Sequence, residues 1–197
     1  LSNISLRHLL DELVADEVRP RLAGDCTLVR YADDFVITFK QHRDAKRALE
    51  VLGKRFARFG LTLHPDKTRF IDFRPQALEV HPDCKAPPFD FLGFTHTWAK
   101  SRKGNNVVRQ RTAKSRLARS LRAVNQWCRD NRHRLVRWQH ERLMAKLRGH
   151  YAYYGITGNI DQLERFSTAV TRLWRKWLAR RTRGKRFIAL SGQERIV

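Results

Sequence analysis

Asp33 and Asp34 are adjacent carboxylates that stand between two apolar runs, residues 26–29 and 35–39. Carboxylates this close repel each other, and a cation that neutralises the pair relieves this repulsion. Mg²⁺ suits such a pair, because it commonly takes one or two protein carboxylates and leaves its other positions to water and substrate phosphates. Phosphoryl transfer by two metal ions uses this arrangement. The residues alone leave an alternative open, a solvent-exposed Asp-Asp turn that binds nothing.

The two apolar runs predict that a β-hairpin carries the carboxylates. Both runs are rich in β-branched and aromatic residues at the length of a strand, and the break between them is too short for anything but a turn. Asp33 is therefore expected at or beside a tight turn. Gly or Asn is the usual residue where such a turn needs a left-handed backbone, although Asp tolerates it. The mismatch favours a functional role over ease of folding.

The rest of the first half predicts an α+β fold with an antiparallel sheet. Apolar residues at helical spacing predict an amphipathic helix over residues 3–18, ending before Pro20. A second helix is predicted over 41–59, with Gly60 as its stop. Alternating residues then predict strands at 61–63, 68–73 and 89–98. Gly93, inside the last of these, marks a bulge or a close approach of the backbone to a ligand.

Positive charge is concentrated in the second half of the chain. The formal net charge is +22, from 41 Lys and Arg against 19 Asp and Glu. Residues 1–99 hold 15 basic and 14 acidic residues, a balance of +1, so residues 100–197 hold the other 26 and 5, a balance of +21. Self-repulsion of this size weighs against compactness, so a polyanion is expected as partner, and nucleic acid is the natural one. We predict two domains, 1–99 and 100–197, joined at the polar linker 101–106.

Three helical patterns predict that the basic half is an all-α bundle. Apolar residues recur at helical spacing over 117–128, 135–154 and 160–177. Three such stripes facing one another form a bundle core. An anionic membrane surface would attract the same charge, but the apolar residues are committed to that core. Arg dominates the outer faces, and its planar guanidinium binds phosphate bidentately or stacks on a base.

Composition argues against several other classes of protein. The sequence has no apolar run long enough to cross a bilayer and no secretory signal. Three widely spaced cysteines, Cys26, Cys84 and Cys128, argue against a disulfide framework or a structural zinc site. We therefore expect reduced thiols and a protein of the cytoplasm, a bacterial one in the first instance, with no membrane partner.

Five segments carry recognisable motifs: L-S-N-I (1–4), L-V-R-Y-A-D-D-F-V-I (28–37), G-L-T-L-H-P-D-K-T (60–68), F-D-F-L-G-F (89–94) and L-R-G-H-Y-A-Y-Y-G (147–155). In this order and spacing they resemble the second half of a reverse transcriptase of the group II intron type, a family whose members also serve as maturases. The resemblance covers nearly the whole chain. It implies a partial reverse-transcriptase palm, with an antiparallel sheet and helices, followed by an all-α thumb bundle.

The resemblance implies RNA-directed DNA synthesis. Asp33 and Asp34 would hold Mg²⁺, which lowers the pKa of the primer 3′ hydroxyl and neutralises charge that builds on the α-phosphate and the departing pyrophosphate. Lys67 is similar in position to a palm lysine that acts as a general acid toward pyrophosphate, and a phosphate or surface contact is its alternative role. The implied partners are template and intron RNA, a DNA primer and, in the complete enzyme, dNTP. A homodimer is a further expectation.

The resemblance also assigns contacts with nucleic acid. Residues 91–94 match the element that steadies the primer terminus, where Gly93 lets the backbone approach the strand, although Phe91 and Leu92 are equally compatible with core packing. The basic bundle matches the thumb, which tracks the template-primer duplex and, in a maturase, grips intron RNA. The residues expected at nucleic acid are Tyr31, Phe91, Leu92, Gly93, Phe94, Arg116, Arg119, Arg122, Arg172, Arg175, Lys176 and Arg180.

The sequence departs from the family pattern in one respect. In the family, another metal-binding Asp and the fingers lie upstream of the position that Leu1 occupies here, and we expect that an upstream part is missing. No other acidic residue has a matching context, so the chain by itself is expected to be inactive in DNA synthesis. The alternative function is that of a non-catalytic, RNA-binding maturase or splicing factor that keeps palm and thumb as a scaffold. Paired cysteines of an endonuclease extension are absent.

Overall fold

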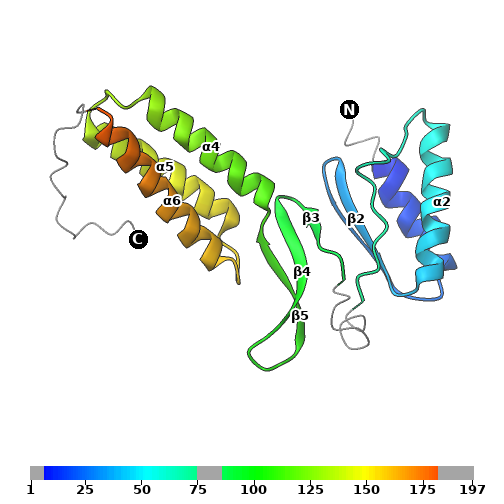
Figure 1. Ribbon diagram of the computed structural model, residues 1–197. Coiled ribbons are helices and arrows are strands. Elements are labelled where there is room, and N and C mark those ends of the chain that lie inside the picture. Colours follow the sequence, from blue (N-terminus) through cyan, green and yellow to red (C-terminus); the bar gives the residue numbers. More distant parts are fainter. Residues whose placement is uncertain (1–6, 75–85, 182–197) are drawn as a thin grey trace. The chain divides into compact units, whose positions relative to one another are not determined.

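In the computed structural model, the described residues are 7–74 and 86–181 (Figure 1). The motif at 1–4 and Cys84 lie outside them. Contacts divide the chain between Leu92 and Gly93. This division lies seven residues before the predicted boundary at residue 99 (99 − 92 = 7), because the segment after Gly93 forms a β-hairpin that groups with the basic helices.

The first unit begins with helical turns and a β-hairpin. Its elements are η1 (Arg7–Asp11), η2 (Leu13–Val18), η3 (Arg19–Arg21), β1 (Cys26–Tyr31), β2 (Asp34–Phe39) and α2 (His42–Arg58). The predicted first helix is helical in its described part, but η1 and η2 are wound as wider π-helical turns. The predicted end at residue 18, before Pro20, is confirmed, since η2 ends at Val18. A separate 3₁₀ turn, η3, follows, and Pro20 lies in its first turn, where the missing N–H is not needed.

The hairpin and α2 cover one hydrophobic core. Strands β1 and β2 pair antiparallel from Cys26 opposite Phe39 to Tyr31 opposite Asp34. Alternate residues of β1, among them Leu28, face the core, and their neighbours face outward. The buried core consists of Leu10, Leu13, Val14, Val18, Ala48, Leu52 and Phe56. Because a slip of one residue would turn the apolar side chains of β1 to solvent, this core fixes the register of the hairpin.

Two predicted strands, 61–63 and 68–73, are wrong. The chain from Leu61 to Phe73 has no ladder in the structure, and residues 65–67 form a turn. Leu61 is 41% exposed and Phe70 is 45% exposed, so the alternation there does not bury one face. Alternation predicts a strand only where another strand supplies hydrogen bonds, and among the described residues none does. Phe70 instead packs edge-on against His42, with ring centroids 5.3 Å apart.

A second sheet follows in the order β3 (Phe89–Phe91), β4 (Phe94–Lys100) and β5 (Asn106–Thr112). The predicted single strand over 89–98 is therefore interrupted. Leu92 and Gly93 have φ of 49° and 80°, the two left-handed residues of a type I′ hairpin turn, not a bulge. Residues 101–105 of the predicted linker form the loop between β4 and β5, and its last residue, Asn106, begins β5. The two strands pair from Phe94 opposite Thr112 to Lys100 opposite Asn106.

The three predicted helices of the basic half are confirmed. They are α4 (Lys114–Asp130), α5 (Val136–Tyr154) and α6 (Ile160–Ala179), which lie side by side in Figure 1. Their shared core contains Val124, Cys128, Leu143, Leu147, Phe166, Val170 and Trp177. The second and third predicted stripes were one residue too long at their starts, because Leu135 and Ile160 are 76% and 62% exposed. No helix among the described residues is long and apolar enough to cross a membrane.

Candidate catalytic hairpin and nucleic-acid interface

The turn between β1 and β2 presents both aspartates to solvent. Tyr31 pairs with Asp34, so Ala32 and Asp33 form a two-residue turn. Tyr31, Asp33 and Asp34 are all exposed, Tyr31 by 68%. The left-handed residue is Ala32, with φ of 51°, whereas the sequence pointed to Asp33. Ala at such a φ costs about 1 kcal/mol, so the strain expected at this turn lies one residue earlier.

Arg30 anchors this turn through side-chain hydrogen bonds. Its Nε and Nη2 donate to Oδ1 and Oδ2 of Asp11 at 2.9 and 2.7 Å, and its Nη1 donates to the carbonyl oxygen of Ala32 at 3.2 Å. The hydrogen bond with Asp11 is the main cause that raises the pKa of Arg30, and the charge of Asp33 adds to it. One guanidinium thus joins η1 to the backbone of the turn, so Arg30 and Asp11 are positioning residues for the carboxylate pair.

Asp33 and Asp34 fit part of a magnesium site. No ion pair or hydrogen bond ties either carboxylate to another described residue, so their oxygens are available to a hard cation. Within the described ranges no group of three or more His, Cys, Asp or Glu could hold a metal. These residues therefore supply two protein ligands at most, and the remainder of a coordination shell comes from elsewhere.

Lys67 is exposed in the turn that follows His64, whose carbonyl oxygen accepts its backbone N–H at 3.1 Å. Neither an ion pair nor a hydrogen bond joins Lys67 to Asp33 or Asp34 among the described residues. The structure thus leaves its role as a general acid a prediction, beside the simpler role of a surface contact.

Aromatic and basic residues gather where β4 begins and α5 ends. The ring of Phe94 stacks on Tyr153 at 6.0 Å and meets Tyr154 edge-on at 5.3 Å, measured between centroids. Burial is the main cause that raises the pKa of Tyr154, while Arg116 and Arg119 act to lower it, as nearby cations do. Three of the residues predicted at nucleic acid, Phe94, Arg116 and Arg119, therefore share one surface, and Tyr153 is a member that the sequence reasoning missed.

Gly93 borders the same surface. A Cβ built on Gly93 would lie 3.2 Å from Oη of Tyr154 and 3.7 Å from Cγ of Arg116. The backbone approach expected at this glycine is thus made toward the protein's own Tyr154. Phe91 and Leu92 are half-buried, which agrees with the packing role left open for them.

The remaining predicted basic residues are spread over two helices. All are exposed: Arg122 on α4, and Arg172, Arg175, Lys176 and Arg180 on or just after α6. Lys176 and Arg180 place their charges 5.8 and 4.9 Å from the ring centroid of Trp177. Solvent-exposed cations over an aromatic ring agree with phosphate binding, but they do not identify a ligand.

The comparison with protein families bears on the hairpin. Residues 1–96 match the family model of reverse transcriptase (RNA-dependent DNA polymerase). The matched reverse transcriptase segment contains η1 to α2, the Asp33-Asp34 turn and β3. It ends before α4, so it does not include the helical bundle. No curated protein matches the chain.

The reverse transcriptase match supports the mixed α/β architecture of this segment as a partial palm. It also supports a nucleic-acid template and primer as the general class of partner, and Mg²⁺ as the cation that reverse transcriptase domains generally use. The sequence contained one indication of the Arg30–Asp11 pair, which the prediction did not use. Arg30 stands at an inward-facing position of the alternating strand β1, where a charged side chain requires a partner.

Proposed function

We propose that this chain is the palm-hairpin and thumb part of an RNA-directed DNA polymerase of the group II intron type. The observation that carries the proposal is the exposed Asp33-Asp34 pair on a hairpin anchored by Arg30, inside the segment that matches reverse transcriptases. Asp33 and Asp34 would hold Mg²⁺, which activates the primer 3′ hydroxyl and offsets charge on the α-phosphate.

The chain's own residues would divide the work between the two units. In the first unit, the Arg30–Asp11 pair keeps the carboxylates projecting into solvent, where a primer terminus can reach them. In the second unit, the surface of Phe94, Tyr153 and the neighbouring arginines would hold template-primer through phosphates and aromatic contact. Water and substrate phosphates would fill other positions around the ion, and an upstream carboxylate of the complete enzyme would join Asp33 and Asp34.

Primer extension tests the polymerase proposal. The chain would be joined to the fingers and upstream palm of a related reverse transcriptase and assayed on an RNA template with Mg²⁺. Asp33→Asn removes one ligand charge and is expected to lower the rate of synthesis by about a hundredfold or more. Asp66→Asn, a matched loss of charge at a residue whose side chain is 90% exposed, should leave the rate unchanged. Equal rates for both variants would refute the proposal.

A second candidate is a non-catalytic, RNA-binding maturase or splicing factor. The balance of +21 over residues 100–197 favours it, because this charge serves RNA binding without any metal site. Asp33→Ala separates the two functions. The chain is a splicing factor if two results hold: the Asp33→Ala variant keeps its RNA affinity and splicing, and the completed protein with intact Asp33 makes no DNA. Loss of synthesis in the variant, from an active parent, identifies the polymerase.

A further inference from the structure

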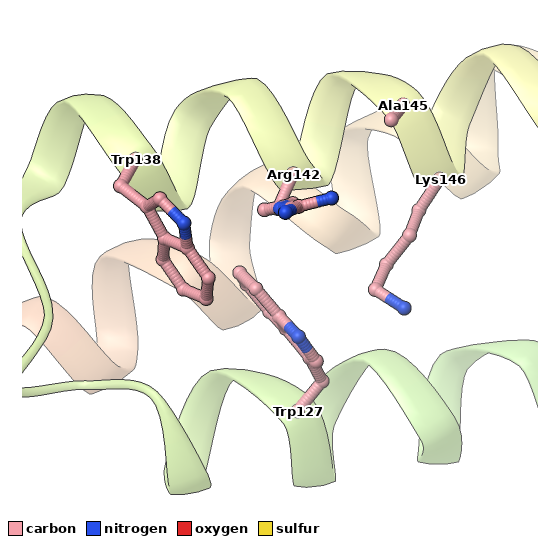
Figure 2. Close-up of a pocket in the computed structure, with 5 residues that line it drawn as sticks. All are labelled: Trp127, Trp138, Arg142, Ala145 and Lys146. Carbon is pink, nitrogen blue, oxygen red and sulfur yellow. The ribbon is translucent and has the colours of Figure 1, made fainter.

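An open pocket of about 480 Å³ lies between α4 and α5, and none of the residues assigned a role above lines it. Trp127 comes from α4, and the other lining residues, Trp138, Arg142, Ala145 and Lys146, come from α5. Figure 2 shows the indole of Trp127 pointing toward the side chains of α5. The volume falls within the roughly 300–1,000 Å³ of small-ligand sites.

The two tryptophans form an aromatic surface, and neither indole N–H donates a hydrogen bond to another described residue. Their rings stack at 5.9 Å between centroids with an angle of 22°. On α6, Trp174 and Trp177 each donate their indole N–H to a side-chain oxygen, at 2.9 Å in both cases. Trp127 and Trp138 make no such bond to another described residue, so their polar edges remain available. Both are only half-buried.

Cations surround this aromatic surface without acidic partners. The guanidinium of Arg142 lies 5.7 Å from the ring centroid of Trp138, and the ammonium of Lys146 lies 5.6 Å from that of Trp127. Arg134 approaches Trp138 at 5.9 Å. No carboxylate lines the pocket, and neither Arg142 nor Lys146 forms an ion pair within the described ranges. The site therefore combines flat apolar rings with uncompensated positive charge.

We propose that this pocket binds an unpaired base of single-stranded RNA. The base stacks on the tryptophan pair, and the flanking phosphates contact Arg142 and Lys146. Single-stranded RNA fits because its bases are free to splay out onto aromatic side chains, whereas a duplex presents only its backbone and shallow groove. An acidic peptide would use the two cations but leave the stacked rings unexplained. The proposal rests on nucleic-acid binding by the bundle, and it adds a site for single strands.

Binding of a labelled single-stranded RNA oligonucleotide to the full chain tests the proposal. Because stacking contributes about 1–3 kcal/mol per base, Trp138→Leu is expected to weaken binding about tenfold. Trp138→Phe, which keeps an aromatic face, should retain most of the affinity. Binding of a fully paired RNA duplex should change less than about twofold in both variants. Circular dichroism and thermal melting establish that each variant is folded.

A charge-matched pair of variants tests the phosphate contacts. Arg142→Gln and Arg137→Gln each remove one charge from α5, but the Arg137 side chain is 92% exposed beside Glu141 and away from the pocket. We expect Arg142→Gln to weaken single-strand binding several-fold more than Arg137→Gln. Equal effects, or an unchanged affinity in Trp138→Leu, would overturn the pocket while leaving RNA binding by the bundle intact.

Two further ligands complete the test with the unaltered protein. An oligonucleotide with abasic sites keeps its phosphates, so it should bind about tenfold more weakly than the intact RNA; equal binding overturns the proposal. If an acidic peptide displaces the RNA and its binding depends on Trp138, the pocket is a peptide site and the proposal is wrong. If the chain binds no nucleic acid at all, the proposed function fails together with the pocket.

Discussion

At the scale of single residues, Arg30 holds the turn of Asp33 and Asp34 in place through its hydrogen bonds to Asp11 and to the carbonyl oxygen of Ala32. Adjacent Asp33 and Asp34 between two strand-like runs are visible in the sequence, because the signal is local. The partner of Arg30 lies 19 residues away in η1, and only the packing of η1 against the hairpin brings Asp11 to it. The pairing of Tyr31 with Asp34 makes Ala32 the first residue of the turn and gives it the left-handed backbone. The sequence alone did not predict which two residues pair across the turn.

The Arg30–Asp11 pair predicts a measurable loss of stability. Asp11→Asn keeps the shape of the side chain but removes the charge that the bidentate guanidinium meets, and the Arg30 side chain is only 19% exposed. We expect the free energy of unfolding in urea to fall, because the charge-assisted hydrogen bonds between Arg30 and Asp11 are weakened. Glu17→Gln, which breaks the single-bonded pair with Arg55, serves as a control and should cost less. Equal losses would show that the pair does not anchor the hairpin.

His150 predicts a pH dependence of the second unit. Its ring stacks on Phe166 with centroids 3.8 Å apart, its Nε2 has no hydrogen-bond partner among the described residues, and burial lowers its pKa below the ordinary 6.5. The unfolded state therefore binds a proton more readily than the folded state. Stability is full above pH 6.5 and falls as the pH drops below that value.

Thermal melting between pH 5 and pH 8 measures this effect. His150→Phe keeps a ring against Phe166 and removes the titrating group, so its melting temperature should fall less on acidification than that of the unaltered chain. The exposed His133 provides the control, since His133→Gln should preserve the acid sensitivity. An unchanged pH profile in His150→Phe would contradict the assignment.

At the scale of elements, helices were predicted better than strands. A helix satisfies its own backbone, so the stripes of α4, α5 and α6 were enough to place them. A strand needs a partner, and residues 61–73 alternate without one. Strand β5 was missed for the complementary reason: Val107 and Val108 are adjacent and both exposed, so its sequence shows no alternation although β4 pairs with it fully.

Asn159 joins three elements, so the stability of the second unit is expected to depend on this one side chain. It is fully buried. Its Oδ1 accepts from the backbone N–H of Thr112 at 2.9 Å, and its Nδ2 donates to Oγ1 of Thr112 and to the carbonyl oxygen of Tyr154, each at 2.8 Å. The end of β5, the end of α5 and the start of α6 thus meet at one amide.

Asn159→Ala should therefore be costly. It leaves buried groups of Thr112 and Tyr154 unpaired, so we expect the free energy of unfolding to fall by about 2–4 kcal/mol. Asn131→Ala is the matched control, because the half-buried Asn131 donates one side-chain bond, to the carbonyl oxygen of Trp127 at 2.9 Å, and should cost about 1 kcal/mol. Urea denaturation followed by circular dichroism measures both. Similar losses would mean that Asn159 is not a junction.

At the scale of the whole molecule, charge was the clearest sequence signal. The balance of +1 over residues 1–99 and +21 over residues 100–197 predicts that the second half is the one that binds a polyanion. Charge alone does not predict which faces of that half are the candidates. The structure adds two candidate surfaces, one with Phe94, Arg116 and Arg119 near Tyr153 and Tyr154, and the pocket lined by Trp127 and Trp138.

This charge predicts a steep dependence of RNA binding on salt. Each phosphate neutralised releases condensed counterions, so the logarithm of affinity should fall by about 0.7 to 0.9 for every phosphate contacted per unit of log salt concentration. Titrations of the chain with a template-primer duplex between about 50 and 200 mM salt measure the slope.

The double variant Arg116→Gln and Arg119→Gln should make this slope shallower by about 1.5, if both residues contact phosphate. Lys54→Gln, at an exposed position of α2 in the near-neutral half, is the control and should leave the slope within error. A slope that is flat in the unaltered chain would show that the basic bundle does not bind nucleic acid electrostatically, and an unchanged slope in the double variant would move the contact to the arginines of α6.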